Sequence, residues 1–341
     1  MTTVHQLGEL GLIRRLRVDD PALAPGIRTG VGDDAAVLEP TLGAVLLATT
    51  DLVIEDVHFR RASASPRDIG WKAMAVNLSD IAAMGGRPRW ALVALALPPS
   101  TPVDDVDGLY AGMREAAAPH GVVIVGGDTS ASPRGWMINV TLLGEHSGTP
   151  RLRSMARAGD AIAVTGTLGR SAAGLAVLGV GADAGRRAGM GAAAVDALTR
   201  SHLRPVARVA EGRWLGAQAA VHALMDCSDG LATDLGHICR ESGVRARVEV
   251  ARVPVDPAAR EAAGALGEDA LDWATGGGED YELLLCCAPE AAPALAEGLR
   301  GATGTALTVI GTATSGPPEV TWVDARGEAV SIRAGYEHFH E

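Results

Sequence analysis

The sequence predicts a mixed α/β (α+β) protein built from two domains. Its 341 residues are about twice the length of a typical domain of roughly 150 residues. Short apolar runs typical of strands alternate with runs of helical spacing in both halves of the chain. Because 47% of the residues are hydrophobic and 21% are charged, the chain can form well-filled cores, which excludes general disorder.

In the first half, predicted strands alternate with two helices. The apolar run 44–48 predicts a buried strand that ends at the polar cluster Thr49-Thr50-Asp51. Apolar residues at helical spacing predict a helix over 68–84, which stops at the glycine pair 85–86. Further strands are expected at 90–97, 122–125 and 137–143, and a second helix at 103–118.

The second half repeats this order after a break in the pattern around residues 148–159. We therefore expect domains at 1–148 and 149–341. The later elements are a strand at 161–164, a helix at 171–178, an apolar approach at 219–225, an acidic turn at 226–230 and a helix to about residue 240. Ser228 is the expected N-cap of that helix, and the Gly- and Ala-rich stretch 179–194 is expected to be a mobile surface connection.

Composition excludes several classes of function. The formal net charge of −11 and the lack of a basic run disfavour nucleic acid and membrane surfaces as partners. No segment is apolar for long enough to span a membrane, so a cytoplasmic protein is expected. The four cysteines lack paired spacing, which argues against a zinc site. Lys72 is the only lysine and follows Trp71, so the chain has no Walker A loop.

Aspartates recur where apolar runs stop. Asp34, Asp51, Asp128 and the pair Asp226 and Asp229 all occupy such positions, and Asp80 lies in the predicted helix 68–84. A single Asp beside glycine is more often a turn residue than a metal ligand. Repetition of the pattern favours a metal site, because carboxylates gathered without a nearby lysine repel one another unless cations neutralise them. Oxygen ligands of this kind suit several Mg²⁺ ions that bridge to phosphates.

Seven motifs, in order, resemble those of the thiamine-monophosphate kinase family. They are GDDAAV at 32–37, TDLV at 50–53 with VHF at 57–59, KAMAVNLSDIAAMG at 72–85, GGDT at 126–129, VTGTLG at 164–169, SDGL at 228–231 and GGEDYEL at 277–283. The resemblance runs from about residue 8 to residue 339. It implies the fold shared with aminoimidazole ribonucleotide synthetase, in which the N-terminal domains pair strands across a homodimer.

The resemblance also implies an activity and roles for individual residues. The activity is transfer of the ATP γ-phosphoryl group to thiamine monophosphate, giving thiamine diphosphate. The implied Mg²⁺ ligands are Asp34, Thr49, Thr50, Asp51, Asp80, Asp128, Asp226 and Asp229. The implied ATP-binding residues are Tyr110, Gly127, Asp128, Arg153 and Ser228, and the implied substrate-binding residues are His58, Glu279 and Tyr336. Asp128, Arg153 and Asp229 form the expected catalytic group, with Arg153 the candidate for transition-state charge.

Two alternatives remain open at this stage. One is an ATP-dependent ligase of the aminoimidazole ribonucleotide synthetase type, and the other is a sensor that binds Mg-ATP without turning it over. Selenophosphate synthetase is disfavoured because it relies on a cysteine or selenocysteine near the N-terminus, whereas the first cysteine here is Cys227. A hydrogenase-maturation carbamoyl dehydratase is disfavoured because it needs a C-terminal cysteine, and the sequence ends Phe-His-Glu.

Overall fold

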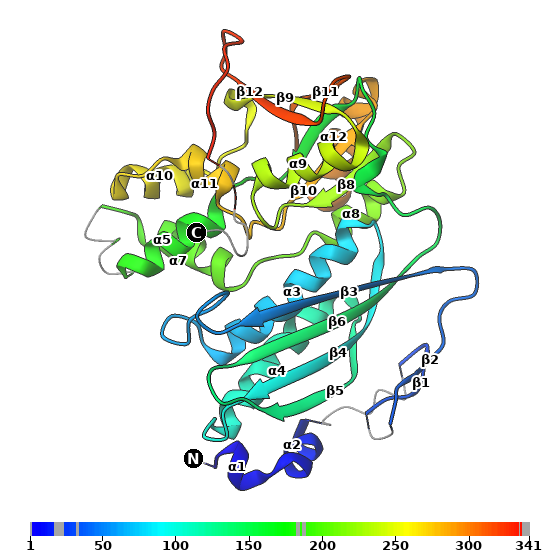
Figure 1. Ribbon diagram of the computed structural model, residues 1–341, viewed down its shortest axis with the longest axis vertical. Helices are drawn as coiled ribbons and strands as arrows, with labels where there is room; N and C mark the ends of the chain where they lie inside the picture. Colours follow the sequence, from blue (N-terminus) through cyan, green and yellow to red (C-terminus); the bar gives the residue numbers. More distant parts are fainter. Residues whose placement is uncertain are drawn as a thin grey trace. The chain divides into compact units, whose positions relative to one another are not determined.

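The computed structural model describes residues 2–16, 24–31, 34–181, 185, 189–333 and 335. The chain divides into two compact units (Figure 1). Unit 1 comprises Met1–Ile81 and Gly86–Thr149, and unit 2 comprises Ala82–Gly85 and Pro150–Glu341. Each unit contains both strands and helices, so the predicted mixed α/β, two-domain class is confirmed.

Unit 1 is built around a four-stranded sheet of order β3-β6-β4-β5, in which only the β4/β5 pair is parallel. Helices α3 and α4 cover one face of this sheet (Figure 1). The strands are β3 (Val45–Ile54), β4 (Arg87–Leu97), β5 (Val123–Ala131) and β6 (Met137–His146). The remaining elements are α1 (Val4–Leu7), α2 (Glu9–Leu16), β1 (Ile27–Thr29), β2 (Val37–Leu38), α3 (Pro66–Ala83), α4 (Val103–Ala117) and the 3₁₀ turn η2 (Ala118–His120).

Helix α3 has well-defined signals at both ends. At its start, Ser65 Oγ accepts from Asp68 N (3.2 Å) and Asp68 Oδ2 accepts from Ser65 N (3.2 Å), which is a capping box with Pro66 at the first helical position. At its end, the N–H of Gly86 bonds to the carbonyl of Ile81, and Gly85 adopts φ +70°. The prediction that this helix stops at the two glycines is confirmed.

Glycines allow α3 and α4 to pack closely. A Cβ at Gly70 would lie 1.8 Å from the carbonyl oxygen of Leu109 in α4, and a Cβ at Gly112 would lie 1.9 Å from that of Arg67 in α3. No side chain fits between these backbones. The two helices therefore pack backbone against backbone at these two glycines.

The predicted ends of two strands were wrong. Strand β3 continues through Thr49-Thr50-Asp51 to Ile54, and β5 continues through the GGDT motif to Ala131. Strand β3 is also not fully buried, because alternate residues such as Leu46 and Leu52 are exposed. The polar cluster is compatible with a strand because Thr is a good strand former and its hydroxyls find partners on either side.

Unit 2 contains a six-stranded sheet of order β12-β9-β11-β7-β10-β8. Its neighbours are antiparallel except β12 and β9. The strands are β7 (Ala161–Thr165), β8 (Val221–Asp226), β9 (Arg245–Glu249), β10 (Leu283–Cys287), β11 (Leu307–Thr314) and β12 (Glu319–Val323). The helices are α5 (Arg170–Val180), α7 (Ala192–Leu203), α8 (Val209–Gly216), α9 (Leu231–Ser242), α10 (Pro257–Leu266), α11 (Ala270–Gly276) and α12 (Ala292–Thr303), with 3₁₀ turns η3 (Arg153–Met155), η4 (Val250–Arg252) and η5 (Pro289–Ala291).

Two buried clusters stabilise unit 2. The larger joins the sheet to α9, and the smaller joins α5, α7 and α10. Met190 belongs to the smaller cluster and is 4% exposed, so the stretch 179–194 is not wholly a surface connection. Residues 182–184 and 186–188 of that stretch lie outside the described residues. Within the described parts of the chain, no helix combines the length and the apolar character needed to cross a membrane.

Candidate active site

A cavity of about 1200 Å³ lies in unit 1. Its lining includes four of the residues predicted to bind metal or ATP, namely Asp34, Tyr110, Gly127 and Asp128. Asn139 and Thr141 of β6 also line it, so polar groups from the sheet face a largely apolar wall. The cavity therefore brings together a metal candidate from the β1–β2 region and the GGDT motif of β5.

Gly127 occupies a position where no side chain fits. A Cβ at this residue would lie 1.9 Å from the carbonyl oxygen of Val93 on β4. Strand β5 therefore lies very close to β4 at Gly127, and the next residue of β5, Asp128, is exposed. The GGDT motif thus combines a steric requirement with an accessible carboxylate.

The polar cluster of β3 faces both sides of the sheet. Thr49 Oγ1 donates a hydrogen bond to Asp80 Oδ2 of α3. Thr50 Oγ1 lies 3.1 Å from Thr141 Oγ1 and 3.2 Å from Asn139 Oδ1 on the opposite face. Because side chains alternate along a strand, Asp51 shares the face of Thr49.

Asp51 and Asp128 lie far apart within one chain. The register places Asp51 opposite Val140, Val140 opposite Val93, and Val93 opposite Gly127. Three strand spacings of about 4.8 Å separate the outer members of this row by roughly 14 Å. Two Asp side chains cannot bridge that distance through one ion with bonds of about 2.1 Å. The two carboxylates thus belong to different ion positions if both bind Mg²⁺.

His58 lies in a tight turn after β3. Its backbone N–H donates to the carbonyl of Ile54 (2.9 Å), and its ring Nδ1 accepts from the N–H of Ile54 (3.0 Å). Asp56 in the same turn has φ +66°, an uncommon conformation for a non-glycine residue. The imidazole is partly exposed.

In unit 2, two predicted motifs lie side by side. Glu279 N–H donates to Ser228 O (2.7 Å), and Tyr281 N–H donates to Cys227 O (2.9 Å). These bonds bring the substrate candidate Glu279 next to the SDGL turn that carries Asp229. Glu279 and Tyr281 have φ +58° and +52°, and such strained backbone clusters at functional sites.

Asp234 completes the turn at the start of α9. The prediction that Ser228 is the N-cap of α9 was wrong, because Gly230 occupies the N-cap position. Asp234 Oδ2 instead accepts from the N–H groups of Asp229 (3.3 Å) and Gly230 (3.1 Å). Burial, followed by the charges of Asp226 and Asp229, raises the pKa of Asp234 well above its usual range. Asp226 itself is the buried last residue of β8.

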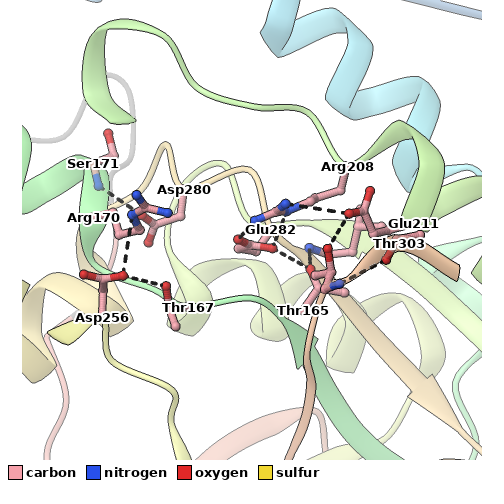
Figure 2. Close-up of polar contacts among 12 residues, drawn as sticks. Thr165, Thr167, Arg170, Ser171, Arg208, Glu211, Asp256, Asp280, Glu282 and Thr303 are labelled. Carbon is pink, nitrogen blue, oxygen red and sulfur yellow. Dashed lines mark hydrogen bonds and ion pairs between the residues drawn. The ribbon is translucent and has the colours of Figure 1, made fainter. Parts of the chain in front are cut away.

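The GGEDYEL motif also supports helix α5. Asp280 accepts from the N–H of Gly169 at 2.6 Å. It also accepts from the N–H of Ser171 at 3.0 Å at the helix start (Figure 2). Burial raises the pKa of Asp280 to about 7, although these hydrogen bonds lower it. His202 Nδ1 lies 3.0 Å from Ser171 Oγ and 3.3 Å from Glu279 Oε2. Because both contacts use the same ring nitrogen, this group is not a hydrolase triad.

The remaining predicted residues are placed separately. Arg153 is exposed in η3, and its carbonyl accepts from Ser242 Oγ (2.8 Å). Tyr110 is buried, which raises its pKa to about 12. Tyr336 lies outside the described residues. Among the residues with described positions, no three His, Cys, Asp or Glu side chains form a group able to hold a metal ion by themselves.

Several polar residues near these motifs escaped the sequence analysis. Glu282 forms a bidentate ion pair with Arg208 and accepts a hydrogen bond from Thr165 Oγ1 at 2.7 Å (Figure 2). Glu282 and Thr165 lie inside predicted motifs, which could have singled them out. Arg208 lies in no motif, so only the folded chain identifies it as their partner.

Comparison with known proteins gives the family. A family model described as AIR synthase related protein, N-terminal domain, matches residues 32–146, and the corresponding C-terminal domain model matches residues 157–324. The thiamine-monophosphate kinase of Mycobacterium tuberculosis (strain ATCC 25618 / H37Rv) is 40% identical over 83% of this chain and 82% of its own length. The chain belongs to the thiamine-monophosphate kinase family.

Solved structures agree with this family assignment. The crystal structure of thiamine-monophosphate kinase from Stenotrophomonas maltophilia K279a is 36% identical, has a TM-score of 0.78, and covers 93% of this chain and 95% of its own. The structure of AaThiL complexed with AMPPCP and TMP is 33% identical, has a TM-score of 0.75 and covers 99% of both chains. The predicted membership of the thiamine-monophosphate kinase family is confirmed.

Proposed function

We propose that this chain transfers the γ-phosphoryl group of ATP to thiamine monophosphate, giving thiamine diphosphate and ADP. The observation that carries the proposal is similarity over 99% of the chain to AaThiL, a protein solved with AMPPCP and TMP. The seven motifs that resemble those of the family occur in this chain in the same order. Its place of action is proposed to be the cytoplasm.

The proposed metal ligands fit Mg²⁺ in their chemistry, because they offer only carboxylate and hydroxyl oxygens. We assign Asp34 and Asp128 to ions at the unit 1 cavity. Asp51, Thr49 and Asp80 supply oxygens on the helix-covered side of the sheet, and Thr50 supplies one on the other face. Asp226 and Asp229 supply oxygens at the end of β8. Bound Mg²⁺ would neutralise phosphate charge and align the reacting groups.

The substrates are assigned by the same motifs. ATP is proposed to contact Tyr110, Gly127, Asp128, Arg153 and Ser228, and thiamine monophosphate to contact His58, Glu279 and Tyr336. Residues 1–148 would supply metal and ATP ligands, and residues 149–341 would complete the substrate site. Exposed Arg153 can stabilise charge on the transferred phosphoryl group, and Asp128 and Asp229 complete the catalytic group.

The reaction needs no strong general base. The nucleophile is a phosphate oxygen whose second pKa is near 6, so it is largely ionised at neutral pH. The barrier lies in bringing two anions together in line, which positioning and charge neutralisation address. A site rich in oxygen ligands and poor in lysine is consistent with this requirement.

We also propose a homodimer that pairs the four-stranded sheets of unit 1. The sheet face opposite α3 and α4 exposes Leu46, Leu52 and Met137 near one edge, with exposed fractions of 50%, 43% and 38%. Burial of these side chains against a second copy would remove apolar surface from water. Sedimentation of the purified chain tests this assignment.

One assay tests the activity. The protein is incubated with ATP and Mg²⁺ together with thiamine monophosphate or with formylglycinamidine ribonucleotide, and ADP and thiamine diphosphate are measured. Thiamine diphosphate formed at one equivalent per ADP supports the proposal. ADP formed only with the ribonucleotide would indicate the ligase, and tight ATP binding without turnover would indicate a sensor.

A further inference from the structure

The only lysine of the chain is buried next to the turn that carries His58. Lys72 lies in α3 and is 4% exposed, and its Nζ donates to the carbonyl oxygen of His58 at 3.1 Å. Burying an ammonium group is costly unless it is hydrogen-bonded. Lys72 therefore makes a specific contact with the turn instead of only filling space.

A second contact fixes the imidazole of the same residue. Ring Nδ1 of His58 lies 3.0 Å from the N–H of Ile54, a group that can only donate. Nδ1 must therefore accept, so the neutral ring carries its proton on Nε2. The His58 ring is partly exposed.

We propose that Lys72 is a positioning residue that holds His58 as an Nε2–H donor for the phosphate of the phosphorylated acceptor. Lys72 fixes the backbone of the turn, and Ile54 fixes the tautomer and orientation of the ring. An N–H donor of fixed direction suits a phosphate oxygen, which only accepts when ionised. The inference rests on the proposed function, which places His58 beside thiamine monophosphate.

The tautomer is tested first, on the unliganded wild-type protein. A ¹⁵N–¹H correlation spectrum of the histidine rings is recorded, and the His58 signals are assigned by their loss in His58→Asn. We expect an unprotonated Nδ1 and a protonated Nε2. A proton on Nδ1, or rapid exchange between the two tautomers, would overturn the inference without any reference to activity.

Two replacements of His58 distinguish the roles of its two ring nitrogens. The amide of Asn can take the place of Nδ1 and keep the turn, whereas the amide of Gln can reach the place of Nε2 and donate. Loss of a hydrogen bond to a charged group corresponds to roughly a ten- to hundredfold change. We expect His58→Asn to raise the KM for thiamine monophosphate by about that factor, His58→Gln to raise it much less, and neither to change the KM for ATP.

The role of Lys72 is tested by asking whether the effect of a Lys72 substitution on the KM for thiamine monophosphate depends on the presence of His58. Lys72→Met should raise the KM for thiamine monophosphate, and Lys72→Arg should restore much of the loss because it retains a donor. In a His58→Asn background, Lys72→Met should add little, because residues that act through one another are not additive. Equal effects of Asn and Gln at position 58, or an undiminished Lys72→Met effect in the double variant, would refute the inference.

The proposed function can fail separately from this inference. If the wild-type protein makes no thiamine diphosphate, the proposed function fails whatever the ring spectrum shows. If the wild-type protein is active, the ring spectrum and the two variants His58→Asn and His58→Gln decide the inference even when Lys72→Met does not fold. Circular dichroism of each variant identifies that case.

Discussion

Arg208 and Glu282 form a bidentate ion pair in the interior of unit 2, with Nε–Oε2 and Nη2–Oε1 distances of 2.8 and 2.5 Å (Figure 2). The Glu282 side chain is 3% exposed, and it also accepts from Thr165 Oγ1. Thr165 Oγ1 in turn accepts from the N–H of Leu283 (2.8 Å). The ion pair thus connects the residue before α8 to the neighbouring strands β7 and β10, next to the GGEDYEL motif.

Replacement of Glu282 by Gln should strongly destabilise unit 2. The change removes the closer of the two carboxylates that pair with the largely buried guanidinium of Arg208 and leaves only Glu211, at 3.7 Å. Breaking a buried pair costs up to about 3–5 kcal/mol. Glu39→Gln is the matched control, because Glu39 and Arg28 form an exposed pair. Urea denaturation followed by circular dichroism measures both variants. Similar midpoints for the two would contradict the expectation.

Close packing of α3 on α4 predicts that Gly70→Ala destabilises unit 1. The added Cβ would lie 1.8 Å from the Leu109 carbonyl oxygen, so the helices must separate, and overpacking costs about 1–3 kcal/mol or more. Gly264→Ala provides the contrast, since this residue of α10 has open space around its Cβ position. Gly264→Ala should increase the free energy of unfolding by about 0.5–1 kcal/mol. Thermal unfolding should move the two melting temperatures in opposite directions.

Local signals account for what the sequence predicted well. Helix α3 was located because the helical spacing of its apolar residues and its terminal glycine pair are both contiguous in the chain, whereas its capping box, which places the start at Pro66 and not at residue 68, was not recognised. Strand β3 was cut short because Thr49-Thr50-Asp51 looks like a polar stop, whereas the partners of these threonines lie on α3 and β6. Motif order identified the family, since it depends only on sequence.

Long-range pairings account for what the sequence did not predict. Arg208 is 74 residues from Glu282, and neither charge pattern nor spacing links them. Likewise, the contact of Lys72 with the His58 carbonyl depends on how the turn after β3 folds back on α3. Candidate ligands could be named from motifs, but the separation of Asp51 from Asp128 emerged only from the register of four strands.

Acid stability should depend on Glu145. Burial raises the pKa of this carboxyl, but hydrogen bonds from Thr41 and the charge of Arg89 outweigh burial and lower it overall. An acid whose folded pKa is depressed contributes stability above its unfolded pKa, about 4.3, and loses it as the pH falls through the folded value. The difference in unfolding free energy between wild type and Glu145→Gln should therefore shrink below about pH 4.3. A difference that stays constant from pH 7 to pH 3 would be evidence against this role.

Removal of single proposed metal ligands should abolish turnover without unfolding the protein. Asp128→Asn and Asp51→Asn each keep the shape of the side chain but remove a negative charge that Mg²⁺ requires, so phosphoryl transfer should fall by orders of magnitude. Glu268→Gln makes the same charge change at an exposed position outside the proposed site and should retain activity. Since three strand spacings, roughly 14 Å, separate Asp51 from Gly127, the residue before Asp128, each variant should alter the Mg²⁺ dependence separately. Unchanged kcat in both Asp variants at subsaturating Mg²⁺ would remove these residues from the site.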